Sequence, residues 1–306
     1  MYPLSATDTR VGWVPGLHQA EGSPLKSSPL AADEEAEVMA FLRERPTFTF
    51  GMAGFIRDNG LVSAHNRGAF YGCRDQEGRF VGVALIGHYV LFEARSENVI
   101  AAFAGVAQRR RDLHLLLGQS GEVDTFWSYY ADGGQRPRLF CRELLLELRW
   151  PVGVLKPVPD LRLAEPNDLD LIVPSHARSV VEESGIDPLE VDPVNFRERC
   201  RRRIEQKHTW VWINNGKLIF KAEIVSDTPE VIYVEGVEVN PAERGKGYGL
   251  RCISQLSRTL LHRAPSVCLL ANQRNTAAQA FYRKAGYKLI GYYDSIYLQE
   301  NTKGAG

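Results

Sequence analysis

Apolar, strand-like runs and the polar turns between them follow one another in the same order in both halves of the chain. Each half has two strand-like runs joined by a turn, and a third run follows them. These runs lie at 70–74, 80–86 and 89–93 in the first half and at 210–213, 218–224 and 231–239 in the second. Asn215-Gly216 joins two of the runs and is typical of a two-residue hairpin, because both residues tolerate positive φ. The pattern predicts two α/β modules of similar plan.

Helical periodicity and proline content set the boundaries of these modules. Periodicity begins near Asp33, a plausible N-cap, and two further helices are predicted at 168–183 and 195–206. Three prolines between Pro151 and Pro159 exclude a regular helix or central strand. The predicted organisation is a poorly ordered arm at 1–30, a first module at 31–150, a linker at 151–159, a second module at 160–300 and a tail at 301–306.

Composition narrows the class of protein. The 306 residues carry 37 basic and 37 acidic side chains, so the chain lacks the cationic field of a non-specific nucleic-acid binder. No apolar stretch is long enough for a membrane span, and no signal peptide is recognisable. The five cysteines form no disulfide framework, and the histidines show no metal-ligand spacing. We expect a cytoplasmic protein without a metal site, a nucleic-acid partner or a membrane partner.

A glycine-rich turn lies between the third run of the second half and an apolar helix face. It comprises Arg244, Gly245, Lys246, Gly247, Tyr248 and Gly249. A strand, a glycine-rich turn and a helix point successive N–H groups at a pyrophosphate, and the helix dipole adds to the attraction. The turn matches neither a Walker loop nor the dinucleotide fingerprint. By itself it also fits a turn that only closes a strand–helix unit.

A second motif follows about 30 residues later. Asn275 is a natural N-cap, and Ala280-Phe281-Tyr282 and Gly286-Tyr287 complete a short helix with its C-terminal glycine. Together, Arg244-x-x-Gly247-x-Gly249 and the Asn275 motif resemble the acetyl-CoA motifs of the GNAT N-acetyltransferase superfamily. Further short motifs are similar to bacterial two-module proteins in which an uncharacterised module precedes a GNAT domain. They are Glu182-Glu183-x-Gly185-x-Asp187-Pro188, Phe220-Lys221-Ala222, Gly236-Val237 and Arg244-Gly245 in the second half, with Asn59-Gly60-Leu61 and the hairpin at 70–86 in the first.

The resemblance implies an α/β (α+β) fold of tandem GNAT-like modules, each a mixed, mostly antiparallel sheet flanked by helices. It implies transfer of an acetyl group from acetyl-CoA, as cosubstrate, to a primary amine of a small molecule or protein by direct attack. A non-catalytic acyl-CoA-binding regulator or scaffold is the alternative. The first module shows no glycine-rich turn after 89–93, so it is expected to serve packing, acceptor specificity or dimerisation; a homodimer is possible.

The resemblance also suggests roles for individual residues. The backbone of Val237, Glu238 and Val239 would bind the pantetheine arm and stabilise the oxyanion, and Asn275 would bond the arm or only cap its helix. Tyr282 would protonate the leaving thiolate, because a phenol of pKa near 10 stays protonated at neutral pH; packing beside Phe281 is its alternative.

A base is needed because only about 0.04% of a lysine-like amine is neutral at pH 7. Strict alternation places Glu235 on one face with Tyr233, Val237 and Val239, which makes Glu235 the candidate base. A solvated or ion-paired carboxylate is an equal alternative, and Glu238 replaces it if the register is inverted.

Three further basic features remain without a firm role. The triplets Arg109–Arg111 and Arg201–Arg203 fit solvated faces, or could steer an acidic substrate or the adenosine 3′-phosphate. His176 lies on the first helix of the second module, where an acceptor could bind, although packing suits it better.

Overall fold

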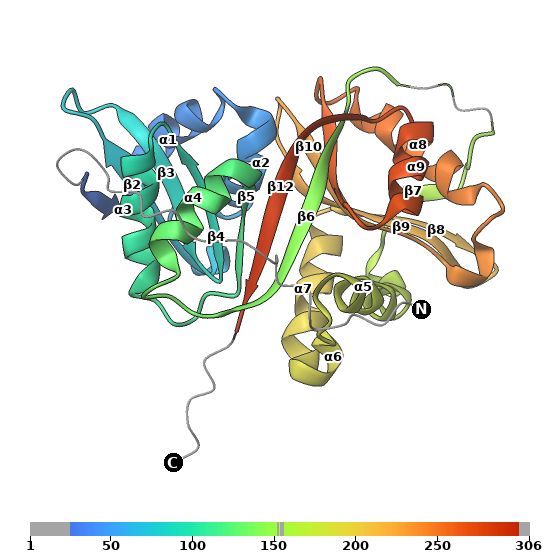
Figure 1. Cartoon of the computed structure of the whole chain (residues 1–306). Coiled ribbons are helices and arrows are strands. Elements are labelled where there is room, and N and C mark those ends of the chain that lie inside the picture. Colours follow the sequence, from blue (N-terminus) through green and yellow to red (C-terminus); the bar gives the residue numbers. More distant parts are fainter. Residues whose placement is uncertain (1–24, 152, 154–155, 300–306) are drawn as a thin grey trace, which may run out of the picture. The chain divides into compact units, whose positions relative to one another are not determined.

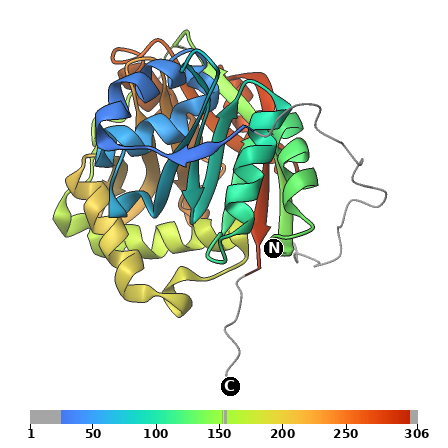
Figure 2. The same ribbon diagram turned by 90° about the vertical axis from the view of Figure 1, so that its left-hand side faces the viewer.

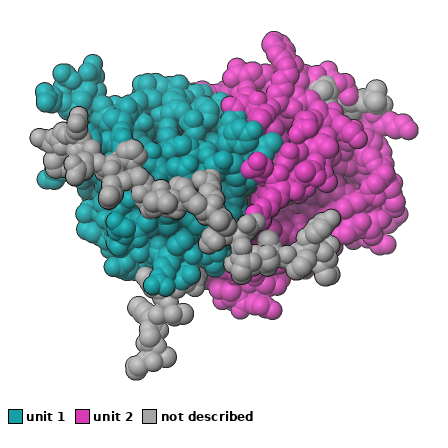
Figure 3. All heavy atoms as spheres, in the orientation of Figure 1, with its two compact units in different colours: residues 1–145, 291–306 teal, residues 146–290 magenta. Residues whose placement is uncertain are grey.

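The computed structural model describes residues 25–151, 153 and 156–299, and the chain divides into two compact units (Figure 3). Unit 1 comprises Met1–Leu145 with Gly291–Gly306, and unit 2 comprises Leu146–Ile290. Residues 1–24 of the predicted arm, three residues of the predicted linker and the predicted tail lie outside the described residues.

Unit 1 contains a mixed sheet with the strand order β1-β2-β3-β4-β5-β12-β6. Its strands are β1 (Ser27–Pro29), β2 (Gly68–Arg74), β3 (Phe80–Gly87), β4 (Tyr89–Ala94), β5 (Leu115–Gln119), and most of β6 (Pro137–Leu148) and β12 (Lys288–Leu298). Its helices are η1 (Ala32–Glu34), α1 (Glu35–Leu42), α2 (Pro46–Asn59), η2 (Ala64–Asn66), α3 (Glu97–Gln108) and α4 (Ser120–Tyr130). β4 and β5 are parallel, whereas β1–β2, β2–β3, β3–β4 and β5–β12 are antiparallel.

Both faces of the unit 1 sheet are covered by helices (Figure 2). Val83 and Leu85 of β3 pack into a core with α1 and α2, whereas Ala84 and Ile86 pack into a second core with α3 and α4. Alternate residues of β3 are therefore apolar on both sides, which explains why this strand is a continuous apolar run. The three runs predicted in this half are confirmed as β2, β3 and β4.

Unit 2 repeats the plan with the strand order β11-β10-β9-β8-β7. Its strands are β7 (Leu161–Leu163), β8 (Thr209–Asn214), β9 (Lys217–Asp227), β10 (Ile232–Val239) and β11 (Val267–Asn272). Its helices are η3 (Pro166–Asp168), α5 (Leu169–Ser184), α6 (Pro188–Val191), α7 (Pro193–Glu205), η4 (Pro241–Glu243), α8 (Tyr248–Leu260) and α9 (Thr276–Lys284). In Figure 1, α5 and α7 lie on one side of these strands and α8 and α9 on the other.

Local chemistry sets several boundaries in unit 2. Asn215 and Gly216 adopt φ of 48° and 71°, so the predicted hairpin turn joins β8 to β9. Asp192 caps α7 by accepting a hydrogen bond from the Asn195 amide, and Asn275 caps α9 by accepting one from the Ala278 amide. The helices predicted at 168–183 and 195–206 are α5 and α7.

The last strand returns the chain from unit 2 to unit 1. Residues Tyr293–Tyr297 of β12 pair antiparallel with β5, which groups Gly291 and the residues after it with unit 1. The predicted second module was one continuous stretch to residue 300, and no local pattern marks this return. In the predicted arm, Ser27–Pro29 forms β1 by pairing with β2.

The described residues contain neither a membrane-spanning helix nor a cluster of metal ligands. None of their helices combines the length and apolar character that crossing a membrane requires. The same residues contain no group of three or more His, Cys, Asp and Glu side chains suited to a metal ion.

Candidate functional site

The two parallel strands of unit 2, β10 and β11, separate soon after they begin. Ile232 and Tyr233 of β10 pair with Val267 and Cys268 of β11, and the register contains no later pair. The remaining residues of both strands therefore have backbone groups that do not bond across this pair. In a parallel sheet, such an opening leaves donors and acceptors for another extended molecule.

A bulge in β10 changes which side chains share a face. Glu235 pairs with Glu223 of β9 and Glu238 pairs with Lys221, so three steps along β10 correspond to two along β9. Because paired residues point to the same face, Glu235 and Glu238 both point toward α5 and α7, and Val239 points the other way. The predicted alternation, with Glu235 and Val239 on one face, is wrong at this bulge.

The glycine-rich turn exposes a run of unpaired amides at the start of α8. Among the described residues, the backbone N–H groups of Gly245, Lys246, Gly247, Tyr248 and Gly249 have no hydrogen-bond acceptor. The first N–H groups of a helix lack internal partners, and here the preceding turn adds more. The arrangement can bind a group with several anionic oxygens.

The two basic side chains of this turn bind the protein itself. The Arg244 Nε donates to the Val239 carbonyl at 3.1 Å, which fastens the turn to the end of β10. The Lys246 Nζ lies 2.7 Å from Glu243 Oε2 in an exposed ion pair. The backbone amides are therefore the principal donors of this site.

The three glycines of the turn are required for two different reasons. Gly245 and Gly247 have φ of 81° and 78°, and a Cβ at either would meet no atom within 4 Å. They satisfy a backbone conformation that other residues adopt with strain. Gly249 has an ordinary φ, but its Cβ would lie 2.7 Å from Val239 Cγ2, so this glycine lets α8 pack against β10.

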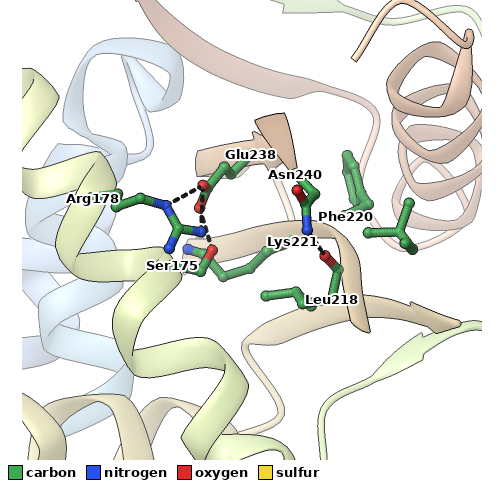
Figure 4. Close-up of a pocket in the computed structure, with 8 residues that line it drawn as sticks. Ser175, Arg178, Leu218, Phe220, Lys221, Glu238 and Asn240 are labelled. Carbon is green, nitrogen blue, oxygen red and sulfur yellow. Dashed lines mark hydrogen bonds and ion pairs between the residues drawn. The ribbon is translucent and has the colours of Figure 1, made fainter. Parts of the chain in front are cut away.

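Glu238 is held by two residues of α5 (Figure 4). Arg178 Nε and Nη2 donate to Glu238 Oε1 at 3.1 and 2.9 Å, and the Ser175 hydroxyl donates to Oε2. Both carboxylate oxygens thus have partners, and only 9% of the residue is exposed. Asn240, just after β10, donates to the Leu218 carbonyl and lines the same small pocket.

Glu235 is less constrained than Glu238. Its nearest ionic partner is Arg203 of α7, with 3.7 Å between Nη2 and Oε1, and 38% of its side chain is exposed. The surrounding protein raises the pKa of the Glu235 carboxyl, because burial penalises the charged form more than the charge of Arg203 favours it. A raised pKa and a partly exposed side chain suit a group that accepts a proton from a bound substrate.

The α9 motif places two tyrosines side by side in different environments. Tyr282 and Tyr287 pack edge to face with ring centroids 5.8 Å apart, and burial raises the pKa of each. The Tyr287 hydroxyl bonds Ser257 Oγ at 2.7 Å, whereas no hydrogen bond joins the Tyr282 hydroxyl to any described residue. Tyr282 therefore has a proton available to donate. Asn275 acts as the α9 cap.

A polar cavity of about 150 Å³ is lined by Glu243 and Tyr248, at the two ends of the turn. Trp212 and Tyr248 form one wall in an edge-to-face contact with centroids 5.0 Å apart. Lys217, Asn215 and Glu243 contribute polar groups. The sequence patterns did not indicate this cavity.

In unit 1, the end of β4 corresponds to the end of β10 but is built differently. β4 pairs regularly with β3 to its end and has no bulge, and α3 follows after two residues without a glycine-rich turn. Arg45 bonds Glu93 of β4 at 2.9 Å and Gln119 of β5 at 2.7 Å, so a guanidinium links the ends of these diverging strands. This unit presents no equivalent of the glycine-rich turn in its described residues.

The basic triplet of α7 divides between two environments. Arg201 is 47% exposed and pairs with Glu198, as a solvated face predicts. Arg203 instead reaches the buried carboxylate of Glu223, where Nη1 and Oε2 are 2.8 Å apart. His176 lies 3.3 Å from the same carboxylate and stacks on Phe196.

Comparison with known proteins gives a family-model match inside unit 2 and a similar fold for the chain. Residues 177–287 match the model of the acetyltransferase (GNAT) family. A comparison with curated proteins gives no match. Three solved structures are similar, as follows. A Drosophila protein has a TM-score of 0.63 and 13% identity, with 91% of this chain and 100% of that chain covered. A tandem GNAT protein from the clavulanic acid biosynthesis pathway has a TM-score of 0.58 and 15% identity, with 92% and 100% covered. A GNAT-family acetyltransferase from Colwellia psychrerythraea has a TM-score of 0.53 and 13% identity, with 90% and 100% covered.

At these identities the structural likeness concerns the fold alone. It confirms the predicted class, tandem modules of mixed, mostly antiparallel sheet flanked by helices. The match at 177–287 includes β10, the glycine-rich turn, α8 and α9, which are the elements of the candidate site.

Proposed function

We propose that this chain, whose residues 177–287 form a GNAT-family domain, transfers an acetyl group from acetyl-CoA to a primary amine. The observation that carries the proposal is the run of amides from Gly245 to Gly249, which have no acceptor among the described residues and follow the end of β10, the strand that separates from β11. Acetyl-CoA has a diphosphate for these amides and an extended amide-containing arm for the separated strand. The residues present fit this cosubstrate.

Each part of the site binds one part of acetyl-CoA. The amides of Gly245–Gly249 and the α8 dipole bind the diphosphate, while Gly245 and Gly247 hold the turn in the required conformation. The backbone of Val237, Glu238 and Val239 bonds the pantetheine arm. Acetyl-CoA supplies an activated acetyl thioester, and the protein supplies orientation and proton transfer.

Three groups of the protein assist direct attack by the amine. Glu235 accepts the amine proton, directly or through one water, so that nitrogen bonds the thioester carbon. A backbone N–H at the bulge, at Val237, stabilises the oxyanion that forms. Tyr282 donates its proton to the sulfur as the carbon–sulfur bond breaks. The nitrogen loses its second proton on becoming an amide, and this proton returns through water to the Tyr282 phenolate, while Glu235 releases its proton to solvent. The products are an acetamide and a free thiol.

Glu235 suits the role of base better than Glu238. Both oxygens of Glu238 are occupied by Ser175 and Arg178, and accepting a proton would disrupt these bonds. Glu235 contacts Arg203 at 3.7 Å and has a partly exposed side chain and a raised pKa. A base with these properties is available to an amine that enters from solvent.

The test uses the full chain with acetyl-CoA and a panel of primary amines. Calorimetry measures acetyl-CoA binding, and a thiol reagent measures release of free coenzyme A. We expect binding, and thiol release that depends on the amine. Glu235→Gln should lower turnover by about 100-fold or more, and Glu238→Gln should lower it less.

The possible failures have different meanings. Binding without thiol release for any amine would replace the enzyme by an acyl-CoA-binding regulator. If acetyl-CoA does not bind the wild-type chain, or binds Gly247→Leu equally well, the glycine-rich turn is not the diphosphate site. The acceptor's chemical class is defined by which amines of the panel react.

A further inference from the structure

Lys221 is a fully buried lysine in the middle of β9. Its side chain is 0% exposed, and its Nζ lies 2.8 Å from Glu223 Oε1. A Cβ at Gly236 would lie 3.1 Å from this Nζ, so the ammonium group sits directly beside the β10 bulge. Burial of an ammonium group costs free energy unless a carboxylate pairs with it. The position of Lys221 therefore indicates a specific structural or functional role.

Glu223 collects several partners around one buried carboxylate. Its side chain is 2% exposed, and it bonds Lys221 through Oε1 and Arg203 through Oε2, both at 2.8 Å. His176 Nδ1 lies 3.3 Å from Oε1. The charges of Lys221 and Arg203 hold the pKa of the Glu223 carboxyl well below its usual value, so it stays ionised at neutral pH.

Arg203 connects this buried carboxylate to the proposed base. One nitrogen of its guanidinium, Nη1, contacts Glu223, and the other, Nη2, lies 3.7 Å from Glu235 Oε1. A guanidinium is a rigid planar fork, so fixing one nitrogen on Glu223 also fixes the position of the other. A lysine at this position could not contact both carboxylates in the same way.

The charged groups form a balanced cluster at the bulge. Lys221 and Arg203 offset Glu223 and Glu235, and burial lowers the pKa of His176 to about 4, so the imidazole is neutral at pH 7. The groups that act on Glu235 are Arg203 from α7 and Lys221 and Glu223 from β9, while His176 of α5 acts on Glu223. No net charge is left buried, and the cluster can be permanent.

We propose that Arg203 is a positioning residue that holds the carboxylate of Glu235 toward the acceptor amine and is itself anchored by Glu223. The proposal rests on the proposed function, in which Glu235 is the base. It deepens that function by assigning a role to a member of the Arg201–Arg203 triplet. Lys221 completes the anchor beside the bulge.

The geometry has a consequence for the ionisation of Glu235. The positive charge of Arg203 favours the carboxylate, so it lowers the pKa that burial raises. Without Arg203, Glu235 would hold its proton to higher pH and would no longer be fixed in direction. Both effects reduce the fraction of enzyme that can accept the amine proton.

The first measurement does not require activity. The full chain, labelled with ¹³C at glutamate carboxyl carbons, is titrated by NMR, and Glu235→Gln identifies the signal of Glu235. We expect Arg203→Gln to move the Glu235 titration upward by about one pH unit and Arg203→Lys to move it less. Arg201→Gln, two residues earlier and exposed, should leave it unchanged. An unchanged titration in Arg203→Gln would overturn the proposed coupling.

The second measurement is a double-mutant cycle in the amine-dependent thiol release. Arg203→Gln should lower kcat about 10-fold or more, move the acid limb of the pH–rate profile upward and leave the acetyl-CoA KM nearly unchanged. Arg203→Lys should restore part of kcat. In a Glu235→Gln background, Arg203→Gln should cost no further activity, because Arg203 acts through Glu235.

The cycle separates positioning from a purely structural role. If Arg203→Gln only damaged the fold, it would lower kcat by the same factor in the wild-type and Glu235→Gln backgrounds. This would hold also if the variants were only partly folded, and this result would overturn the proposal. If the wild-type chain shows no amine-dependent thiol release, the proposed function fails. The NMR titration would then still report whether Arg203 controls Glu235.

Discussion

Glu235 and Glu238 of β10 point to the same face of the unit 2 sheet, although they are three residues apart. The extra residue of the bulge at Gly236-Val237 produces this arrangement, and Gly236 has a φ of 56°. One carboxylate is fixed by α5 and the other stays partly exposed. The bulge therefore creates two carboxylates with different availability, and the corresponding strand of unit 1, β4, is regular.

Gly249→Ala should destabilise unit 2 more than a substitution at the preceding glycines. The new Cβ would lie 2.7 Å from Val239 Cγ2 and 3.2 Å from Phe281 Cε2, so α8 must move away from β10. We expect a loss of about 1–3 kcal/mol in the free energy of unfolding, together with weaker acetyl-CoA binding. Denaturant titration and calorimetry measure the two effects.

Gly245→Asn is the matched control for this substitution. Asparagine tolerates positive φ, and a Cβ at Gly245 meets open space. Its free energy of unfolding should change by less than about 1 kcal/mol. If Gly245→Asn were the more destabilising change, the close contact at Gly249 would not be the feature that fixes α8.

Tyr282→Phe should reduce turnover with little effect on acetyl-CoA affinity. The substitution removes the hydroxyl that would protonate the leaving thiolate and retains the ring that packs against Phe281 and Tyr287. We expect kcat to fall by about 10- to 100-fold, measured by thiol release, and a nearly unchanged dissociation constant.

Tyr287→Phe provides the comparison for Tyr282. It removes the bond to Ser257, a residue buried in α8, and should lower the free energy of unfolding by about 1 kcal/mol without reducing kcat similarly. Equal kcat values for Tyr282→Phe and the wild type would assign Tyr282 to packing alone.

The sequence predicted most elements whose pattern is local. Asn215-Gly216 marked the β8–β9 turn, and Asn275 marked the start of α9. The return of β12 to unit 1 was not predictable, because pairing between Tyr293–Tyr297 and β5 joins residues about 175 positions apart and leaves no periodic signal.

The charged cluster of unit 2 shows why the site was only partly predicted. Lys221 and Glu223 alternate with Phe220, Ala222 and Ile224, a pattern that ordinarily indicates a strand with one solvated face. In the structure α5 and α7 cover that face, and the two charges neutralise each other. The alternation of residues in β9 predicts correctly which side chains share a face. It does not predict whether the polar face is covered by water or by a helix that itself carries charged side chains.

Arg45→Met should destabilise unit 1 in a pH-dependent way. Arg45 bonds the buried Glu93 and lies 3.3 Å from Glu122, and burial raises the pKa of both carboxyls above the usual 4.5. Removing the arginine raises them further, so folding favours the protonated forms. The stability that the protonated carboxyls contribute is fully present below pH 4.5 and is lost as the pH rises through the raised pKa values.

Denaturant titrations at pH 4.5 and pH 8 measure this effect. We expect Arg45→Met to lose about 2 kcal/mol at pH 8, since Arg95 still pairs with Glu93, and less at pH 4.5. Arg79→Met, which removes an exposed ion pair in the same unit, should be nearly neutral at both pH values. An equal loss at both pH values would show that Arg45 contributes packing rather than charge.

His176→Gln should flatten the acid dependence of stability. Burial lowers the pKa of His176 to about 4, whereas an unfolded histidine titrates near 6.5. The unfolded chain therefore binds a proton before the folded chain does, and the stability present above pH 6.5 is lost as the pH falls toward 4. The full effect of this difference is about 3 kcal/mol.

The free energy of unfolding is measured at pH 7 and pH 4.5 for the variant and the wild type. The difference between the two proteins isolates the contribution of His176, because the same carboxyls titrate in both. His176→Gln should be less stable than the wild type at pH 7, because it gives up stacking on Phe196 and the contact with Glu223. Between pH 7 and pH 4.5 its free energy of unfolding should fall less than that of the wild type. His65→Gln, at an exposed histidine of unit 1, should follow the wild type. Parallel pH profiles for His176→Gln and the wild type would mean that the pKa of His176 is the same in the folded and unfolded chain, and burial would then not be what keeps the imidazole neutral.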